Sequence, residues 1–216
     1  MITYKPIRWL LMMVCCSLVV TMAPSQVGAA GDTFKRSAEL AKRTSRTSKD
    51  VDKYVAQLDK TEQALSSVSQ GQGKDLKNRY ESFSKEVDNL EEAQKHATTD
   101  IDEMKSTGAE YFAAWDTSIA QMSNPELKQA STERRSKVMK DHDDLAATLG
   151  EIGSQLQPFM SNLHDLRAFM ETDLSTENVG KAHGMIQKSE DDAQALKEQI
   201  AGVQTTLKQF LSEAPK

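Results

Sequence analysis

The sequence predicts an all-α protein that forms an elongated antiparallel four-helix bundle or coiled coil with up-down-up-down topology. Long stretches repeat apolar residues at alternating spacings of four and three, the pattern of helices that pack along a narrow seam. Short segments containing glycine, asparagine or proline separate these stretches. The 216 residues include five prolines and ten glycines, too few for a loop-rich all-β protein.

The longest stretch runs from Leu76 to Met122 and organises the rest of the chain. At 1.5 Å per residue, a helix of this length is roughly 70 Å long, far longer than a compact domain of this size is wide. It therefore requires long partner helices. Only one glutamine, one glycine and one serine interrupt its apolar seam, which consists of Leu76, Tyr80, Phe83, Val87, Leu90, Gln94, Ala97, Ile101, Met104, Gly108, Tyr111, Trp115, Ser118 and Met122.

A first helix is expected before it, over about 49–69, where apolar residues again follow a helical stripe. The Gly71-Gln72-Gly73 segment ends that helix, because glycine readily adopts the left-handed conformation that closes a helix. So short a connection makes the second helix, over about 74–122, an antiparallel neighbour of the first.

The segment Ser123-Asn124-Pro125-Glu126 is the sharpest local signal in the sequence. Two N-caps fit it. Either Ser123 caps the third helix with Glu126 as its capping-box partner, or Asn124 caps it with Pro125 at the first helical position. Both alternatives place a tight turn here and start a third helix over about 125–172.

Pro158 lies inside that third helix. A proline removes one backbone hydrogen bond and costs about 3 kcal/mol in a regular helix interior. We expect a kink rather than an end, because the apolar seam keeps its phase on both sides. Asp173-Leu174-Ser175 marks the next turn, and a fourth helix is expected over about 176–212.

Residues 1–29 have the order of a signal peptide, which predicts an exported protein, periplasmic or associated with the cell envelope. Lys5 and Arg8 precede an apolar run over 9–23, and small residues follow it. Cleavage is expected after Ala29 or Ala30. An uncleaved anchor is the alternative, although the apolar run is shorter than the about 20 residues that a spanning helix needs.

Both cysteines, Cys15 and Cys16, lie in this apolar run. Lipid attachment is the weaker interpretation, because Met12-Met13-Val14 stands where small residues would precede a lipidated cysteine. Cleavage would leave no cysteine for a disulfide, a thiolate nucleophile or a metal site.

Residues 30–48 are predicted to form a polar, basic lead-in to a single helical-bundle domain over 49–213. Seven basic side chains lie between Lys35 and Lys53. Peripheral contact with a membrane surface or an anionic polymer is one interpretation, and a solvated helix face is the other. Without the leader, 25 basic residues stand against 32 acidic ones, a net charge of −7 instead of −5, which argues against nucleic acid as a partner.

Catalytic and metal-binding signals are weak. None of the four histidines, His96, His142, His164 and His183, is three or four residues from another. In the dense acidic segment 141–144, neighbouring helical side chains point in different directions, so at most two could share one ion. The sequence also contains no glycine-rich phosphate loop and no nucleophile with a recognisable base. We therefore expect no enzymatic activity, no metal and no cofactor.

Tyr111, Phe112 and Trp115 are expected to gather with Phe210 at the end of the bundle that holds the turn at Ser123. A packed core cluster is the favoured interpretation. The alternative is a ligand- or partner-binding site near Trp115, which a pocket lined by all three aromatics would support.

The sequence resembles the bacterial family catalogued as domain of unknown function 2959. The resemblance lies in Tyr111-Phe112-Ala113-Ala114-Trp115, in the turn over 123–131 and in the stretch from Leu156-Gln157-Pro158-Phe159 to Leu174. It implies an exported coiled-coil protein of the cell envelope, of a kind often described as a lipoprotein, with no established activity. The chain departs from the family pattern in lacking a lipidation cysteine and in having Met170-Glu171-Thr172-Asp173 where the family has a basic segment with histidine.

These observations together favour a non-enzymatic exported scaffold, spacer or interaction protein of the bacterial cell envelope. Its partner would be an unknown envelope protein or a second copy of the chain. A helical-bundle binding module with its site near Trp115 is the alternative. A membrane-active bundle of the pore-forming type is a third hypothesis, weakened because the chain after residue 29 has no apolar run long enough to span a bilayer.

Overall fold

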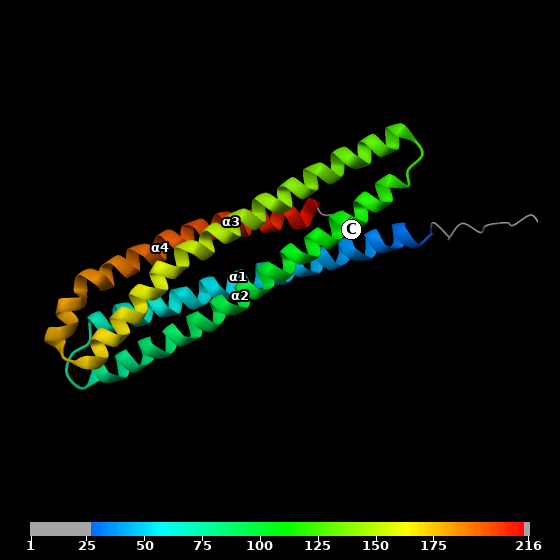
Figure 1. Ribbon diagram of the computed structural model, residues 1–216. Helices are drawn as coiled ribbons and strands as arrows, with labels where there is room; N and C mark the ends of the chain where they lie inside the picture. The colour runs from blue at the N-terminus through cyan, green and yellow to red at the C-terminus, as the bar shows by residue number, and fades with distance from the viewer. Residues whose placement is uncertain (1–26, 214–216) are drawn as a thin grey trace, which may run out of the picture.

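The computed structural model describes residues 27–213, which form four helices (Figure 1). They are α1 (Val27–Ser69), α2 (Asp75–Ala120), α3 (Pro125–Thr172) and α4 (Thr176–Glu213). No strand occurs in this part of the chain. Each helix runs antiparallel to the one before it, which confirms the predicted all-α antiparallel bundle.

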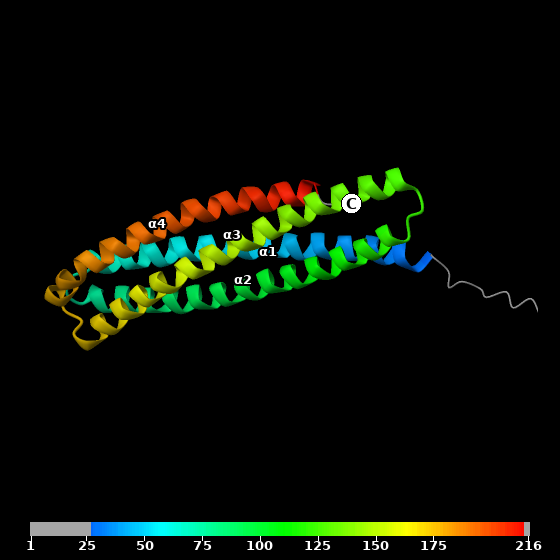
Figure 2. The same cartoon turned by 45° about the horizontal axis from the view of Figure 1, so that its top comes forward.

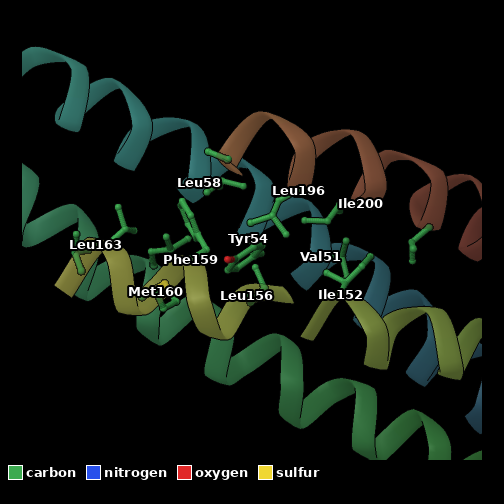
Figure 3. Close-up of a cluster of buried hydrophobic side chains, with 14 of the residues drawn as sticks. Val51, Tyr54, Leu58, Ile152, Leu156, Phe159, Met160, Leu163, Leu196 and Ile200 are labelled. Atoms are coloured by element: carbon green, nitrogen blue, oxygen red, sulfur yellow. The ribbon is translucent and has the colours of Figure 1, made fainter. Parts of the chain in front are cut away.

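The helices enclose one core along the length of the bundle. α1 packs against α2 and α4, and α3 packs against α2 and α4, so that α1 and α3 lie diagonally across the bundle. The contact between α1 and α2 is the most extensive. Figure 3 shows one core region, in which Tyr54 and Leu58 of α1 meet Leu156 and Phe159 of α3 and Leu196 of α4. The predicted seams therefore face one another.

The first helix is much longer than expected. α1 begins at Val27 instead of near residue 49, so the prediction of a separate lead-in over 30–48 is wrong. This segment contributes four buried residues, Ser37, Leu40, Thr44 and Thr47, and only one of them is apolar. Three small polar side chains occupy seam positions, and an apolar periodicity cannot reveal them.

The predicted leader lies mostly outside the described residues. Residues 1–26 are not described, and the two expected cleavage points, after Ala29 and Ala30, fall near the start of α1. Within the described part of the chain, no helix is both long enough and apolar enough to cross a bilayer.

The turns follow the local sequence signals. Gly73 has a φ of 58°, the left-handed conformation that glycine adopts without strain. At the next turn, the Asn124 side chain accepts a hydrogen bond from the Leu127 backbone N–H, and Pro125 is the first helical residue. Of the two predicted N-caps, Asn124 is therefore the one observed. α3 continues through Pro158, so the proline does not end the helix, and the expected kink stays a prediction.

The two ends of the bundle differ. At the closed end, the turns at 70–74 and 173–175 join all four helices. At the open end, α1, α2 and the start of α3 extend past the last residues of α4 (Figures 1 and 2). Two contacts fix this offset: Arg134 Nη2 donates to the Glu213 carbonyl oxygen over 2.7 Å, and Lys137 Nζ lies 3.4 Å from Glu213 Oε2. Residues 125–133 of α3 therefore lie beyond the end of α4.

Candidate functional site

The predicted aromatic group forms a cluster with a histidine near the open end. The ring centroids of Tyr111 and Phe112 are 5.2 Å apart, and those of Tyr111 and Trp115 are 5.4 Å apart. The His142 ring lies between Phe112 and Phe210, with centroid distances of 5.5 and 6.0 Å. We call these five residues the aromatic cluster. It joins three helices, α2, α3 and α4.

Packing rather than a binding cavity explains most of the cluster. Tyr111 and Phe112 are buried, and burial raises the pKa of Tyr111 to about 12. Trp115 is half-buried, and its Nε1 donates to Ser131 Oγ over 3.0 Å, which ties α2 to the start of α3. An open groove of about 500 Å³ lies beside the cluster. Phe112 and His142 line this groove, whereas Tyr111 and Trp115 do not.

Arg135 covers the outer side of Phe112. Its guanidinium carbon is 5.5 Å from the centre of the Phe112 ring, and its Nη2 lies 2.6 Å from Asp116 Oδ2. A guanidinium over a ring face is attracted by the electrons of the ring, and the carboxylate balances its charge. The contact therefore stabilises the packing of α3 on α2.

His142 fits the bundle because Gly108 has no side chain. A Cβ atom at Gly108 would lie 2.3 Å from His142 Nε2, far closer than atoms can approach. His142 is 3% exposed, its Nδ1 is 3.2 Å from Asp143 Oδ1, and its Nε2 has no hydrogen-bond partner. Gly108, one of the residues that interrupt the apolar seam of α2, therefore has a steric role: it leaves room for the His142 ring.

A second polar cluster lies between α1 and α2. Asp50 and Asp100 are buried there, with Asp100 3% exposed, and their side chains share a hydrogen bond. Arg46 Nε is 2.9 Å from Asp100 Oδ2, and Lys53 Nζ is 2.5 Å from Asp50 Oδ1. Thr47 Oγ1 donates to the Asp100 carbonyl oxygen over 3.1 Å. We call this group the aspartate pair with its two cations.

The pKa values of the two aspartates are shifted in opposite directions. The hydrogen bond from Asp100 lowers the pKa of Asp50, whereas burial, together with that same hydrogen bond, raises the pKa of Asp100. Asp100 is therefore the weaker acid of the pair, and Asp50 is the stronger one. Asp50 lines a polar groove of about 540 Å³ with Arg46, Lys49 and His96, but Asp100 is not in the wall of that groove.

Most of the basic residues between Lys35 and Lys53 contact carboxylates. Arg36 pairs with Glu110, Arg43 with Glu103, Arg46 with Asp100 and Lys53 with Asp50. These contacts join α1 to α2, apart from the last, which lies within α1. The positive charge of this segment that is free to contact an anionic surface is therefore smaller than the sequence suggests. Contact with such a surface stays a prediction.

Two of the other histidines pair with acidic side chains outside these clusters. His96 pairs with Glu92 at 3.1 Å, and His164 lies 3.7 Å from Glu91, both on the outside of the bundle. Among the residues from 27 to 213, no three histidine, cysteine or acidic side chains are placed to hold one metal ion.

The burial of His142 and Asp100 was not predicted, although the sequence carries a signal for it. Val138, His142 and Leu145 follow the spacing of four and three that defines the seam of α3, and Ala97, Asp100 and Met104 do so in α2. A polar residue at such a position predicts a buried polar contact. It does not predict which partner lies opposite.

The comparisons with known proteins give a family but no characterised relative. The search of curated proteins found no match, and the search of solved structures found none. The family model described as "Protein of unknown function (DUF2959)" matches residues 31–213, nearly all of the described part. The chain therefore belongs to this family of proteins of unknown function.

Proposed function

We propose that the protein is a non-enzymatic exported scaffold or spacer of the bacterial cell envelope, which acts through contacts at its surface. One observation carries the proposal. The buried apolar core extends from Leu40 and Phe210 at one end to Leu76 and Met170 at the other, along helices of about 70 Å. Such a rod sets a fixed distance between whatever binds its two ends.

The internal polar groups support a structural role. His142 packs among aromatic rings against a glycine, and the aspartate pair is balanced by Arg46 and Lys53. Catalysis requires perturbed groups that a substrate can reach. Asp100, whose pKa is raised, lies in the α1–α2 interface instead of in a groove wall.

The open end offers the surface best suited to a contact. Phe34 and Leu127 are the most exposed large apolar side chains of the described residues, at 62% and 64%. Both lie at this end, on α1 and α3. The predicted leader also precedes α1 in the sequence, so the end of the bundle from which the leader would be cleaved is the end that holds these two exposed side chains.

Site-specific photo-cross-linking in living cells tests this proposal. A photoreactive residue in place of Phe34 or Leu127 should give adducts with envelope components, and the full chain should fractionate with the envelope after loss of its leader. Met185, 43% exposed and near the closed end, is the matched control position. Retention of the uncleaved chain in the cytosol, without adducts at the open end, would refute the proposal.

A further inference from the structure

A narrow void crosses the core about midway along the bundle. Its volume is about 50 Å³, and side chains of all four helices line it. Figure 3 shows the apolar residues at this level, with Val51, Ile152 and Ile200 near Tyr54. Among the described residues, no charged side chain is part of its wall, and Trp115 is not part of it either. The void is therefore an apolar space, separate from the predicted site near Trp115.

The void opens between α2 and α3. The wall residues that reach the surface, Gln94, Thr98, Ile101 and Gly153, belong to these two helices, whereas those of α1 and α4 are buried. The contact between α2 and α3 is also the least extensive of the four main contacts between helices. From this mouth the void extends inward to α1 and α4, on the opposite side of the bundle. It is thus a side entrance to the core.

Tyr54 lies in the wall at the inner end of the void. It is 3% exposed, and its hydroxyl has no hydrogen-bond partner among the described residues. Buried polar groups nearly always have a partner in folded proteins. Burial also raises the pKa of the Tyr54 hydroxyl, so the group stays protonated and can donate. The inner end therefore offers a free hydrogen-bond donor to an acceptor that enters the void.

The size of the void limits what can enter it. One water molecule needs about 10–15 Å³, so roughly three or four atoms of that size fit into the void in a row. An apolar cavity that takes up benzene is about three times as large, at roughly 150 Å³. The void therefore admits the end of an unbranched chain but not a ring.

Beyond the mouth, partly apolar surface continues along α2 and α3. The groove beside the aromatic cluster starts about one turn away, since Lys105 of the groove follows Ile101 of the void by four residues. Ala109, Ala113 and Ala146 are part of the wall of this groove. A chain whose end lies in the void can therefore continue along the outside of the bundle.

We propose that the void binds the polar end of a linear, uncharged amphiphile such as a long-chain alcohol. The terminal oxygen accepts a hydrogen bond from the Tyr54 hydroxyl and donates its own proton to the amide oxygen of Gln94. The first carbons fill the void, and the rest of the chain leaves between α2 and α3. This inference goes beyond the proposed function and does not depend on it.

Isothermal titration calorimetry of the full chain with 1-decanol tests the proposal. The wild-type chain should bind one molecule of the alcohol. Cyclodecanol carries the same hydroxyl on a ring and should bind at least about tenfold more weakly, because the void is too narrow for it. Decanoate should be weakened by at least about tenfold as well, since its charge has no partner in the void.

Tyr54→Phe removes the donor and keeps the ring. It should weaken the binding of 1-decanol by about threefold to tenfold, the range expected for one hydrogen bond. The Tm of the ligand-free variant should not fall, because the hydroxyl has no partner to lose.

Gly153→Leu places a large side chain at the mouth and should abolish binding. Gly150→Leu is the matched control, because Gly150 lies one turn away on α3 and is not part of the wall. At both glycines an added Cβ would have no atom within 4 Å, so both variants should fold, as the helical circular dichroism signal and Tm should show. The control should bind 1-decanol as the wild type does.

Four outcomes would overturn the proposal. They are no binding of 1-decanol, equal affinity for the chain and the ring, equal losses of affinity in the two glycine variants, and a lower Tm of ligand-free Tyr54→Phe. The last would show that the hydroxyl already has a partner, such as water. None of them affects the scaffold proposal, which is tested by cross-linking at the open end.

Discussion

Toward the closed end, the interior is formed mainly by large apolar side chains such as Leu65, Phe83, Leu166 and Ile186, each almost completely buried, with Thr61 and Ser189 as buried polar residues among them. Toward the open end, it includes Thr44, Thr47, Asp100 and His142, together with a glycine. Burial of apolar surface accounts for the stability of the first region. The stability of the second region also depends on matched polar partners and close helix contact. It can therefore be lost more easily when one of these contacts is removed. The difference separates a mainly apolar half from a half that contains more buried polar contacts.

The largest effect is expected from truncation in the closed half. Phe83 is 0% exposed, so Phe83→Ala removes a whole buried ring and should lower the free energy of unfolding by about 3–5 kcal/mol. The matched change in the open half, Phe34→Ala, should alter it by less than about 0.5 kcal/mol. Urea unfolding followed by circular dichroism measures both. Equal losses of unfolding free energy in Phe83→Ala and Phe34→Ala would show that the two halves do not differ in their dependence on apolar burial.

The second prediction concerns Gly108. Gly108→Ala should gain about 0.5–1 kcal/mol of helix propensity but lose about 1–3 kcal/mol by collision with His142, for a net loss. The His142 ring cannot easily move, because Phe112 and Phe210 flank it. In a His142→Ala background, the same substitution should become stabilising. A double-mutant cycle based on urea unfolding measures this change of sign.

Gly180 near the closed end is the matched control for Gly108. No atom lies within 4 Å of the position of an added Cβ at Gly180, so Gly180→Ala should stabilise the protein by up to about 1 kcal/mol. A destabilising effect at Gly180 would contradict the steric argument, which predicts opposite signs at the two glycines.

The third prediction tests the cap at the open end. Asn124→Ala removes the acceptor for the Leu127 N–H and should lower the free energy of unfolding by about 1 kcal/mol. Ser123→Ala should have almost no effect, because Asn124 is the cap. Thermal unfolding of the two variants distinguishes them, and a larger loss at Ser123 would restore the capping box as the correct interpretation.

The smallest effect is a pH dependence from the aspartate pair. The pKa of Asp100 is raised in the folded protein, so its stabilisation is complete below the pKa of an unfolded aspartate and is lost as pH rises through the folded pKa. The pKa of Asp50 is lowered, so its contribution is present above the unfolded pKa and is lost as pH falls through the folded pKa. Arg46, Lys53 and Glu103 are the charged groups nearby.

Asp100→Asn isolates the contribution of Asp100. Asparagine can donate to Asp50 as the protonated acid does, but it cannot ionise. The variant should therefore lose less stability than the wild type as pH rises, by about 0.5–1 kcal/mol, or roughly 1–4 °C in Tm. Thermal unfolding over a series of pH values measures this. Identical pH profiles for the two proteins would show that the pKa of Asp100 is not raised in the folded protein.

Local signals predicted the parts of the fold that depend on neighbouring residues. The start of α3 at Pro125 follows from the Asn-Pro cap, and its end at Thr172 follows from the turn residues after it. The seam of α2 was readable because nearly all its members are apolar. The first half of α1 was not, because its buried threonines look like surface residues in the sequence. Threonine is buried there because it hydrogen-bonds to backbone carbonyls, as Thr44 does to Leu40.

The sequence by itself determined four long helices, their antiparallel order and the aromatic segment at one end, because periodicity, caps and turns are properties of short stretches. Only the tertiary structure decided that His142 lies against Gly108, that Asp50 lies beside Asp100 and that, along the rod, α4 stops short of the level at which α3 begins. These features depend on the offset between helices, which arises from packing along the whole length of the rod and is not encoded in the spacing within any one helix.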